Sequence, residues 1–160
     1  MTDLRLRAAR ADEADLLGEL ALRSKGHWGY DPAFLDACRP ELTYRPDAVE
    51  ARRIVVAESG GRVLGFYSLD GEPPRGELGN MWVEPDAIGT GVGRRLWQHA
   101  VGVARATGFT ALRIDAEPFA EGFYLAMGAQ RVGETPSGSI PGRVLPSLEV
   151  RVAPPAPQRS

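Results

Sequence analysis

The segment from Asn80 to Trp97 constrains this chain more than any other part of the sequence. It has the pattern of a strand that passes through a glycine-rich turn directly into a helix. Gly89, Gly91 and Gly93 permit positive φ angles and let the backbone approach a ligand closely. The helix that follows presents unpaired N–H groups and the positive end of its dipole at this turn. These features together predict a site for a phosphate or pyrophosphate group.

Two basic residues in the first turn of that helix support an anionic partner. Arg94 and Arg95 stand where a helix normally favours acidic side chains. Two other nucleotide-binding motifs fit the segment badly. A dinucleotide fingerprint needs a third glycine where Arg94 stands, and a P-loop needs Gly-Lys-Ser/Thr, which this segment lacks. A glycine turn that serves packing alone remains the alternative interpretation.

Length, charge and cysteine content narrow the class of protein. With 160 residues, we expect a single domain over residues 1–152 and a disordered, proline-rich tail over residues 153–160. A net charge of −2 gives no reason to expect nucleic acid or a membrane surface as a partner. The single cysteine and the lack of a signal-peptide core predict a cytoplasmic protein. Nothing has zinc-ligand spacing, so we expect no metal site.

Hydrophobic periodicity and turn residues predict the order of the elements. Strands are expected near residues 4–7, 54–58, 63–69, 77–83, 111–116, 130–133 and 148–152. Helices are expected between an Asp12 cap and Gly26, over 32–39 and 47–51, and over 91–107 and 120–127. A long loop rich in Ser, Pro and Gly joins the last two expected strands. This order predicts an α/β (mixed α+β) fold, in which a mixed sheet has helices on both faces.

Two motifs in this order resemble those of the GNAT superfamily, the acyl-CoA-dependent N-acyltransferases. The first is Val83-x-Pro85 followed by the three glycines, and the second is Phe123-Tyr124-x-x-x-Gly128. The resemblance extends from Leu4 to Val152. It implies the GNAT fold: a central mixed, mostly antiparallel sheet of six or seven strands that splays between its fourth and fifth strands.

The resemblance also implies acetyl-CoA as co-substrate, with no metal. In this family the glycine turn wraps the pyrophosphate with backbone N–H groups, and the pantetheine arm pairs with the fourth strand. The coenzyme contacts that this implies are Met81, Trp82, Val83, Ile88, Gly89, Thr90, Gly91, Val92, Gly93, Arg94, Glu117 and Phe123. Two of these depart from the family pattern: Ile88 replaces Gln or Arg, and Glu117 replaces an Asn. An ionised Glu117 has no hydrogen to donate to the coenzyme.

Acyl transfer to an amine needs a base for the ammonium, donors for the oxyanion and an acid for the departing thiolate. By resemblance, Tyr124 is the acid. Glu77, at the start of the fourth strand, is the expected base, acting directly or through water. Backbone N–H groups near Met81 to Val83 are the expected oxyanion donors. The alternatives are a tyrosine that only packs and a glutamate that only faces solvent.

The acceptor contacts that we expect are His27, Trp28, Tyr30, Asn80 and Arg143. The first three lie in the loop between the first two helices, which often lines the acceptor site in this family. Aromatic rings can cage an amine, and an arginine can bind a carboxylate. Alternatively, the aromatic residues only fix their loop to the core. The segment 135–146 is either an ordered flap over the acceptor site or an exposed hairpin connection.

The sequence therefore predicts an N-acetyltransferase that moves an acetyl group from acetyl-CoA to a primary amine of a small molecule or peptide, by direct transfer in a ternary complex. A non-catalytic acyl-CoA sensor with the same fold is the alternative, which the departures at Ile88 and Glu117 favour. A binder of another nucleotide is a third hypothesis. Homodimers are common in this family, and a homodimer is one expected assembly.

Overall fold

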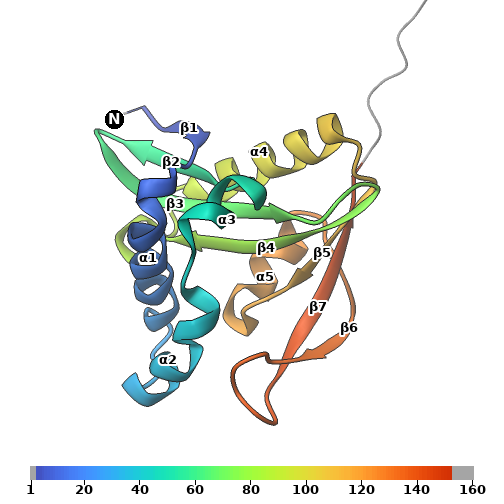
Figure 1. The fold of residues 1–160 in the computed structure, drawn as a ribbon. Coiled ribbons are helices and arrows are strands. Elements are labelled where there is room, and N and C mark those ends of the chain that lie inside the picture. Colours follow the sequence, from blue (N-terminus) through green and yellow to red (C-terminus); the bar gives the residue numbers. More distant parts are fainter. Residues whose placement is uncertain (1–2, 153–160) are drawn as a thin grey trace, which may run out of the picture.

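A computed structural model describes residues 3–152, and its centre is a sheet of seven strands in the order β1-β2-β3-β4-β5-β7-β6 (Figure 1). Every neighbouring pair is antiparallel except β4 and β5, which are parallel. The predicted mixed, mostly antiparallel sheet is thus confirmed, while the expected tail 153–160 lies outside the described residues. The strands are β1 (Arg5–Ala8), β2 (Val55–Ser59), β3 (Arg62–Asp70), β4 (Arg75–Val83), β5 (Ala111–Asp115), β6 (Gln130–Pro136) and β7 (Val144–Arg151).

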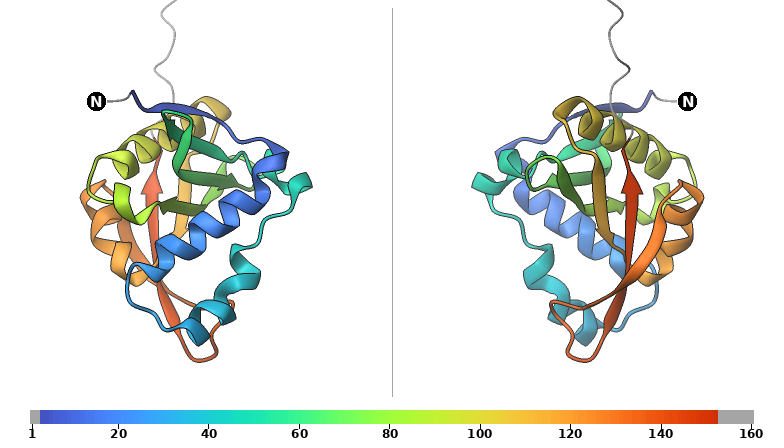
Figure 2. Two further views of the ribbon diagram at one scale, coloured as in Figure 1. Left: turned by 90° about the vertical axis from the view of Figure 1, so that its left-hand side faces the viewer. Right: turned by 90° about the vertical axis from the view of Figure 1, so that its right-hand side faces the viewer.

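Helices cover both faces of the sheet, as the views in Figures 1 and 2 show together. The helices are α1 (Ala14–Gly26), α2 (Pro32–Cys38), α3 (Pro46–Ala51), α4 (Val92–Thr107) and α5 (Glu121–Ala126). Residues of α1, α2 and α3 share one buried cluster with Phe66 of β3. Residues of α4 and α5 share the other with Leu112 of β5. Among residues 3–152, no helix is long and apolar enough to cross a membrane.

The start of the first helix differs from the prediction. A short 3-10 turn, Ala11–Glu13, precedes α1, and Asp12 does not cap the helix with its side chain. Instead, the Glu13 carboxylate accepts a hydrogen bond of 2.8 Å from the backbone N–H of Arg10. Arg7 donates two further hydrogen bonds to the same carboxylate. The carboxylate that accepts a backbone N–H at this helix start is therefore that of Glu13, one residue later than the expected Asp12. The same carboxylate also binds Arg7 of β1.

The strands β4 and β5 pair over only a short stretch. Their register runs from Arg75 opposite Ala111 to Glu77 opposite Arg113 and ends there. Beyond this point the two strands diverge (Figure 1). Backbone groups on the β5-facing edge of β4 therefore have no strand partner there, and in a folded protein such groups need another partner. The predicted splay between the fourth and fifth strands is confirmed.

A β-bulge in β4 marks the start of this divergence. Ser68 of β3 lies opposite Asn80, whereas Leu69 lies opposite Leu78, so Gly79 is an extra residue in β4. A Cβ atom at Gly79 would collide with the Asp70 carboxylate, which a two-fold ion pair with Arg52 holds in place. Bulges bend a strand and re-aim its side chains. The glycine thus allows β4 to turn away from β5.

The connection between the last two strands is shorter than predicted. Strand β6 continues to Pro136 and β7 begins at Val144, so much of the expected loop 135–146 is paired strand. Prolines at 136 and 146 cannot donate ladder hydrogen bonds, and they obscured the strand pattern in the sequence. The tip of the hairpin lies beside α2 (Figure 2), where the Ser139 hydroxyl contacts the Glu41 carboxylate at 3.2 Å. The segment is therefore a hairpin whose tip packs on the first helices.

Two leucines of α1 provide a test of this packing. Leu20 is fully buried between α1 and the sheet, whereas Leu16 of the same helix is exposed. We expect Leu20→Ala to lower the free energy of unfolding by about 2–5 kcal/mol, because it leaves a cavity in the core. Leu16→Ala should change it by less than about 1 kcal/mol. Urea denaturation followed by circular dichroism measures both, and equal effects would contradict the described position of α1.

Candidate active site

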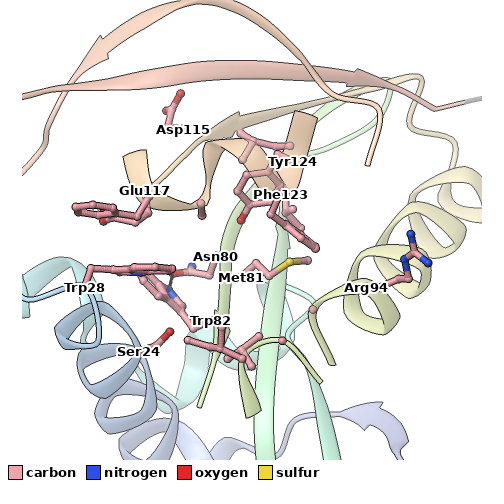
Figure 3. A pocket seen from close by; sticks show the side chains of 18 of the residues that line it. Ser24, Trp28, Asn80, Met81, Trp82, Arg94, Asp115, Glu117, Phe123 and Tyr124 are labelled. Carbon is pink, nitrogen blue, oxygen red and sulfur yellow. Dashed lines mark hydrogen bonds between the residues drawn. The ribbon is translucent and has the colours of Figure 1, made fainter. Parts of the chain in front are cut away.

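A cavity of about 470 Å³ occupies the space where β4 and β5 diverge (Figure 3). One end lies at the glycine turn and the start of α4. The other end lies beside the C-terminal end of α1 and the turn after β5. The residues that line it are Ser24, Trp28, Leu78, Gly79, Asn80, Met81, Trp82, Val83, Ile88, Gly89, Gly91, Gly93, Arg94, Ile114, Asp115, Glu117, Phe119, Ala120, Phe123 and Tyr124.

The glycine turn has the geometry that the sequence predicts. Gly89 and Gly91 have φ angles of 82° and 97°, and Gly91 is the N-cap residue of α4. The first-turn N–H groups of α4 have no intrahelical acceptor, so they are available to an anion at the mouth of the cavity. Arg94 of this turn lines the cavity. Gly93 lies inside α4 and does not have the positive φ expected of it, and a Cβ atom there would make an ordinary contact of 3.5 Å with the Phe123 ring.

Most of the coenzyme contacts implied by the resemblance line the cavity, and two do not. Thr90 is absent from the lining, and its hydroxyl donates to the backbone oxygen of Ala87. Val92 is buried in the core on the α4 side of the sheet. Their side chains therefore serve the turn and the core. The Thr90 backbone N–H also donates to the Ala87 oxygen, at 3.2 Å, so of these two residues only the Val92 N–H remains as a predicted coenzyme contact.

Tyr124 lies between the two ends of the cavity. Its ring is buried and packs against Trp97 and Phe123, and Figure 3 shows its hydroxyl directed into the cavity. Burial, with a smaller contribution from the Glu117 carboxylate, raises the pKa of Tyr124 above its ordinary value. The phenol therefore stays protonated at neutral pH, as a proton donor must.

Glu77 lies at the base of the divergence and does not line the cavity. It is half-buried and faces Asp70 of β3 and Arg113 of β5 in the strand registers. Burial raises the pKa of the Glu77 carboxyl, and the nearby Asp115 and Asp70 carboxylates raise it further. From this position Glu77 cannot contact an acceptor in the cavity directly. It could therefore act as a base only through a bridging water.

The far end of the cavity is aromatic. The rings of Trp28 and Phe119 stack with centroids 5.3 Å apart and planes within 8°. Phe119 is 56% exposed, although it is a large apolar residue. Of the predicted acceptor contacts, Trp28 and Asn80 line the cavity, whereas His27, Tyr30 and Arg143 do not. His27 packs edge-on against Trp28.

Asn80 belongs to a buried hydrogen-bond network. Its side-chain oxygen accepts from the Tyr44 hydroxyl at 2.7 Å and from the Trp82 indole at 3.1 Å. Its amide donates to the Ser68 hydroxyl at 3.0 Å. These bonds fix the Trp82 ring on the wall of the cavity. A contact between Asn80 and an acceptor stays a prediction.

Glu117 is held by other parts of the chain. Its carboxylate accepts a hydrogen bond of 2.8 Å from Lys25 and another from the Tyr30 hydroxyl. Arg143 of the hairpin donates to the same hydroxyl at 2.7 Å and lies 3.6 Å from the carboxylate. The Lys25 and Glu117 side chains are only 9% and 6% exposed. We call these four residues the Glu117 cluster.

The sequence analysis missed several residues of this site. Lys25 belongs to no recognisable motif, and its partner Glu117 is 92 positions away. Ser24, Asp115 and Phe119 also line the cavity and carry no motif of their own. For Phe119, the one signal in the sequence was its position two residues after Glu117, a predicted site residue. Within residues 3–152, no group of three or more His, Cys, Asp and Glu side chains is arranged to hold a metal ion.

Comparison with known proteins identifies the family. The model of the acetyltransferase (GNAT) family matches residues 20–129. The chain therefore belongs to this family, as the glycine turn and the motif around Tyr124 indicated. A curated relative, the IAA acetyltransferase of Azospirillum brasilense, is 38% identical over 65 residues. That alignment covers 39% of this chain and 42% of the relative, so the chain spans less than half the length of that protein.

Solved structures share the fold. The PaiA N-acetyltransferase of Thermoplasma acidophilum, solved with coenzyme A, is similar with a TM-score of 0.78 and 15% identity, over 93% of this chain and 99% of that one. YncA of Salmonella typhimurium, solved with acetyl-CoA, is similar with a TM-score of 0.68 and 19% identity, over 99% of each chain. At these identities the likeness concerns the fold.

The glycine turn gives a test of the anion site. We expect Gly91→Glu to weaken coenzyme A binding by about 100-fold or more, because it places a carboxylate beside the pyrophosphate position and like charges there cost several kcal/mol. Isothermal titration calorimetry measures the affinity.

Two control variants separate charge from backbone strain. Gly91→Asn is neutral, and asparagine tolerates positive φ, so it should lose much less affinity. Gly102→Glu adds the same charge on an exposed position of α4 and should bind coenzyme A normally. Full affinity in Gly91→Glu would show that the turn does not hold the pyrophosphate.

Proposed function

We propose that this protein is an N-acetyltransferase that moves an acetyl group from acetyl-CoA to a primary amine. The observation that carries the proposal is one continuous cavity with the glycine turn and the α4 N-terminus at one end and Tyr124 in its middle. Membership of the acetyltransferase family agrees with it. The pyrophosphate would bind at Gly89 to Arg94. The pantetheine arm would follow the β4 edge that β5 leaves unpaired, which brings the thioester towards Tyr124.

The proposed reaction is a direct transfer in a ternary complex. The amine attacks the thioester carbonyl, the C–S bond breaks, and coenzyme A leaves as the thiol. The described lining contains no cysteine, and Cys38 is buried at the C-terminal end of α2, so an acyl-enzyme on a thiol has no support. Backbone N–H groups of Met81 to Val83 are the proposed oxyanion donors. Holding both reactants in one cavity would supply much of the acceleration.

Tyr124 is the proposed acid. The departing thiolate needs a proton, and a neutral phenol directed into the cavity can supply it. A raised pKa keeps that proton on Tyr124 until the thiolate develops. Glu77 is the proposed base, acting through water, and its raised pKa makes it a stronger proton acceptor than an exposed glutamate.

A non-catalytic acyl-CoA sensor is the rival hypothesis. One feature favours the sensor hypothesis. Many family members use an Asn amide at the position of Glu117 to contact the coenzyme, whereas the Glu117 carboxylate binds Lys25 and Tyr30 instead. Thiol release from acetyl-CoA in the presence of an amine panel distinguishes the two. Tight coenzyme binding with no thiol release from any amine would overturn the enzyme proposal.

Tyr124→Phe tests the proposed acid. We expect kcat to fall by about 100-fold or more while coenzyme A affinity stays within about twofold, because only the hydroxyl is lost. Tyr67→Phe is the matched control: that hydroxyl bonds to His99 at 2.8 Å, away from the cavity lining. Unchanged turnover in Tyr124→Phe would remove this residue from the mechanism.

Glu77→Gln tests the proposed base through the pH profile. The wild-type rate should fall as the pH drops through the pKa of Glu77, which lies above the ordinary glutamate value of 4.5, because the protonated carboxyl accepts no proton. In Glu77→Gln, kcat should fall by about 100-fold, and this acid limb should disappear. Glu72→Gln, which alters an exposed carboxylate, should keep the wild-type profile. A normal acid limb in Glu77→Gln would assign it to another group.

A further inference from the structure

The two ends of the cavity differ in chemistry. Arg94 is the only basic residue among the described lining residues, and it lies in the first turn of α4, directly after the glycine turn. The opposite end has Trp28, Trp82 and Phe119 as its apolar surface and Glu117 as its buried charge. Trp82 and Glu117, which the family resemblance assigned to the coenzyme, thus lie on the side away from Arg94. If the turn holds the anionic coenzyme, as proposed above, the opposite end is left for the acceptor. Its side chains therefore carry information on the acceptor class.

The Glu117 carboxylate is fixed before any acceptor arrives. Lys25 bonds to one oxygen and Tyr30 to the other. Lys25 is itself surrounded by the rings of Tyr30, Phe34 and Trp82 at 5.3–5.8 Å from its ammonium. A carboxylate offers about four lone-pair positions, and these donors take two. Glu117 thus retains acceptor capacity, and it lines the cavity, where the N–H groups of an ammonium can use it.

The cations of the Glu117 cluster are already committed. The Lys25 ammonium lies on Glu117, and Arg143 lies on the Tyr30 hydroxyl and the rings of Tyr30 and Phe34. Neither of these cations lines the cavity. A carboxylate on the acceptor would therefore meet the Glu117 carboxylate before it reached a basic group. Such a like-charge contact is costly in a partly desolvated site.

The stacked pair of Trp28 and Phe119 forms an apolar edge at this end. A ring that is 56% exposed and stacked on a tryptophan is a ready surface for a flat, apolar group. The pair is contributed by the loop after α1 and by the 3-10 turn Pro118–Ala120 after β5, so it spans both sides of the cavity. An acceptor that contacts both rings would close this end against water.

We propose that the acceptor is a primary amine with a flat apolar body and no carboxylate, whose ammonium is received by Glu117 and whose body packs on Trp28 and Phe119. The inference rests on the proposed function and adds the acceptor class to it. Lys25, Tyr30 and Arg143 are positioning residues, because they act by holding Glu117.

Four acceptors on the wild-type enzyme test this class, with thiol release as the readout. 2-Phenylethylamine and phenylalaninamide carry the ring without a negative charge, phenylalanine adds the carboxylate, and ethylamine lacks the ring. We expect kcat/KM for 2-phenylethylamine and for phenylalaninamide to exceed that for phenylalanine by about 10-fold or more. Phenylalaninamide controls for the lower basicity of an α-amino group. Phenylethylamine should exceed ethylamine by about 10-fold or more.

Two variants connect the selectivity to the named residues. Glu117→Gln leaves Lys25 and Arg143 without their counter-charge, so the ratio of kcat/KM for phenylalaninamide to phenylalanine should fall by about 10-fold or more. A purely structural role would lower both substrates equally. Trp28→Ala should bring the ratio of phenylethylamine to ethylamine close to one. Val132→Ala, at an exposed apolar position of β6, should leave both ratios unchanged.

The outcomes separate this inference from the proposed function. Equal or better use of phenylalanine by the wild-type enzyme would overturn the inference and favour Arg143 as a carboxylate receptor. Thiol release with peptides or polyamines but with none of the four amines would also overturn it, while the acetyltransferase proposal would stand. Coenzyme binding without thiol release from any amine would overturn both.

Discussion

The short parallel pairing of β4 and β5 determines where the cavity of this protein lies. Because the ladder ends at Glu77 and Arg113, one edge of β4 loses its strand partner, and a cavity opens there instead of a closed sheet. The bulge at Gly79 bends β4 at the same point. Unpaired backbone groups in such a place favour an extended ligand that can take over the missing hydrogen bonds. The coenzyme arm of an acetyltransferase has this shape and chemistry.

A splayed sheet needs another interaction to hold its two halves together, and the Lys25–Glu117 ion pair spans the opening. Lys25 belongs to α1, which packs on the β4 side, and Glu117 follows β5. Burying such a pair gains little net stability, but removing one partner costs about 3–5 kcal/mol because a buried charge is left alone. Arg143 extends the same link to the β6–β7 hairpin. The cluster thus fixes the width of the cavity while it fixes the acceptor end.

Local sequence patterns predicted the parts of this fold that local physics determines. The glycine turn, the amphipathic α4 and the motif around Tyr124 are each encoded within a few consecutive residues. The hairpin β6–β7 was predicted too short, because Pro136 and Pro146 obscure the two-residue alternation although the backbone still pairs. The Glu117 cluster could not be predicted from local patterns. Tyr30 is 87 positions from Glu117 and 113 positions from Arg143, and it forms a hydrogen bond with each. Only the folded sheet brings α1, the end of β5 and the hairpin together.

The proposed reactants, a coenzyme with several negative charges and a cationic amine, would meet different side chains at the two ends of the cavity. The α4 N-terminus and Arg94 lie at one end of the cavity, and the Glu117 carboxylate, which is paired with Lys25, lies at the other. In the proposed complex, the coenzyme phosphates would be attracted to the α4 N-terminus, and the ammonium would use the acceptor positions that Lys25 and Tyr30 leave on Glu117. Tyr124 lies between these regions, where attraction to the two ends would bring the thioester and the amine together. The Glu117 carboxylate, which is the proposed receiver of the ammonium, contributes to the raised pKa of the Tyr124 phenol, so acceptor binding and proton donation would be electrostatically linked. An ammonium that neutralises Glu117 would lower the cost of the charge that develops on Tyr124 as its proton leaves.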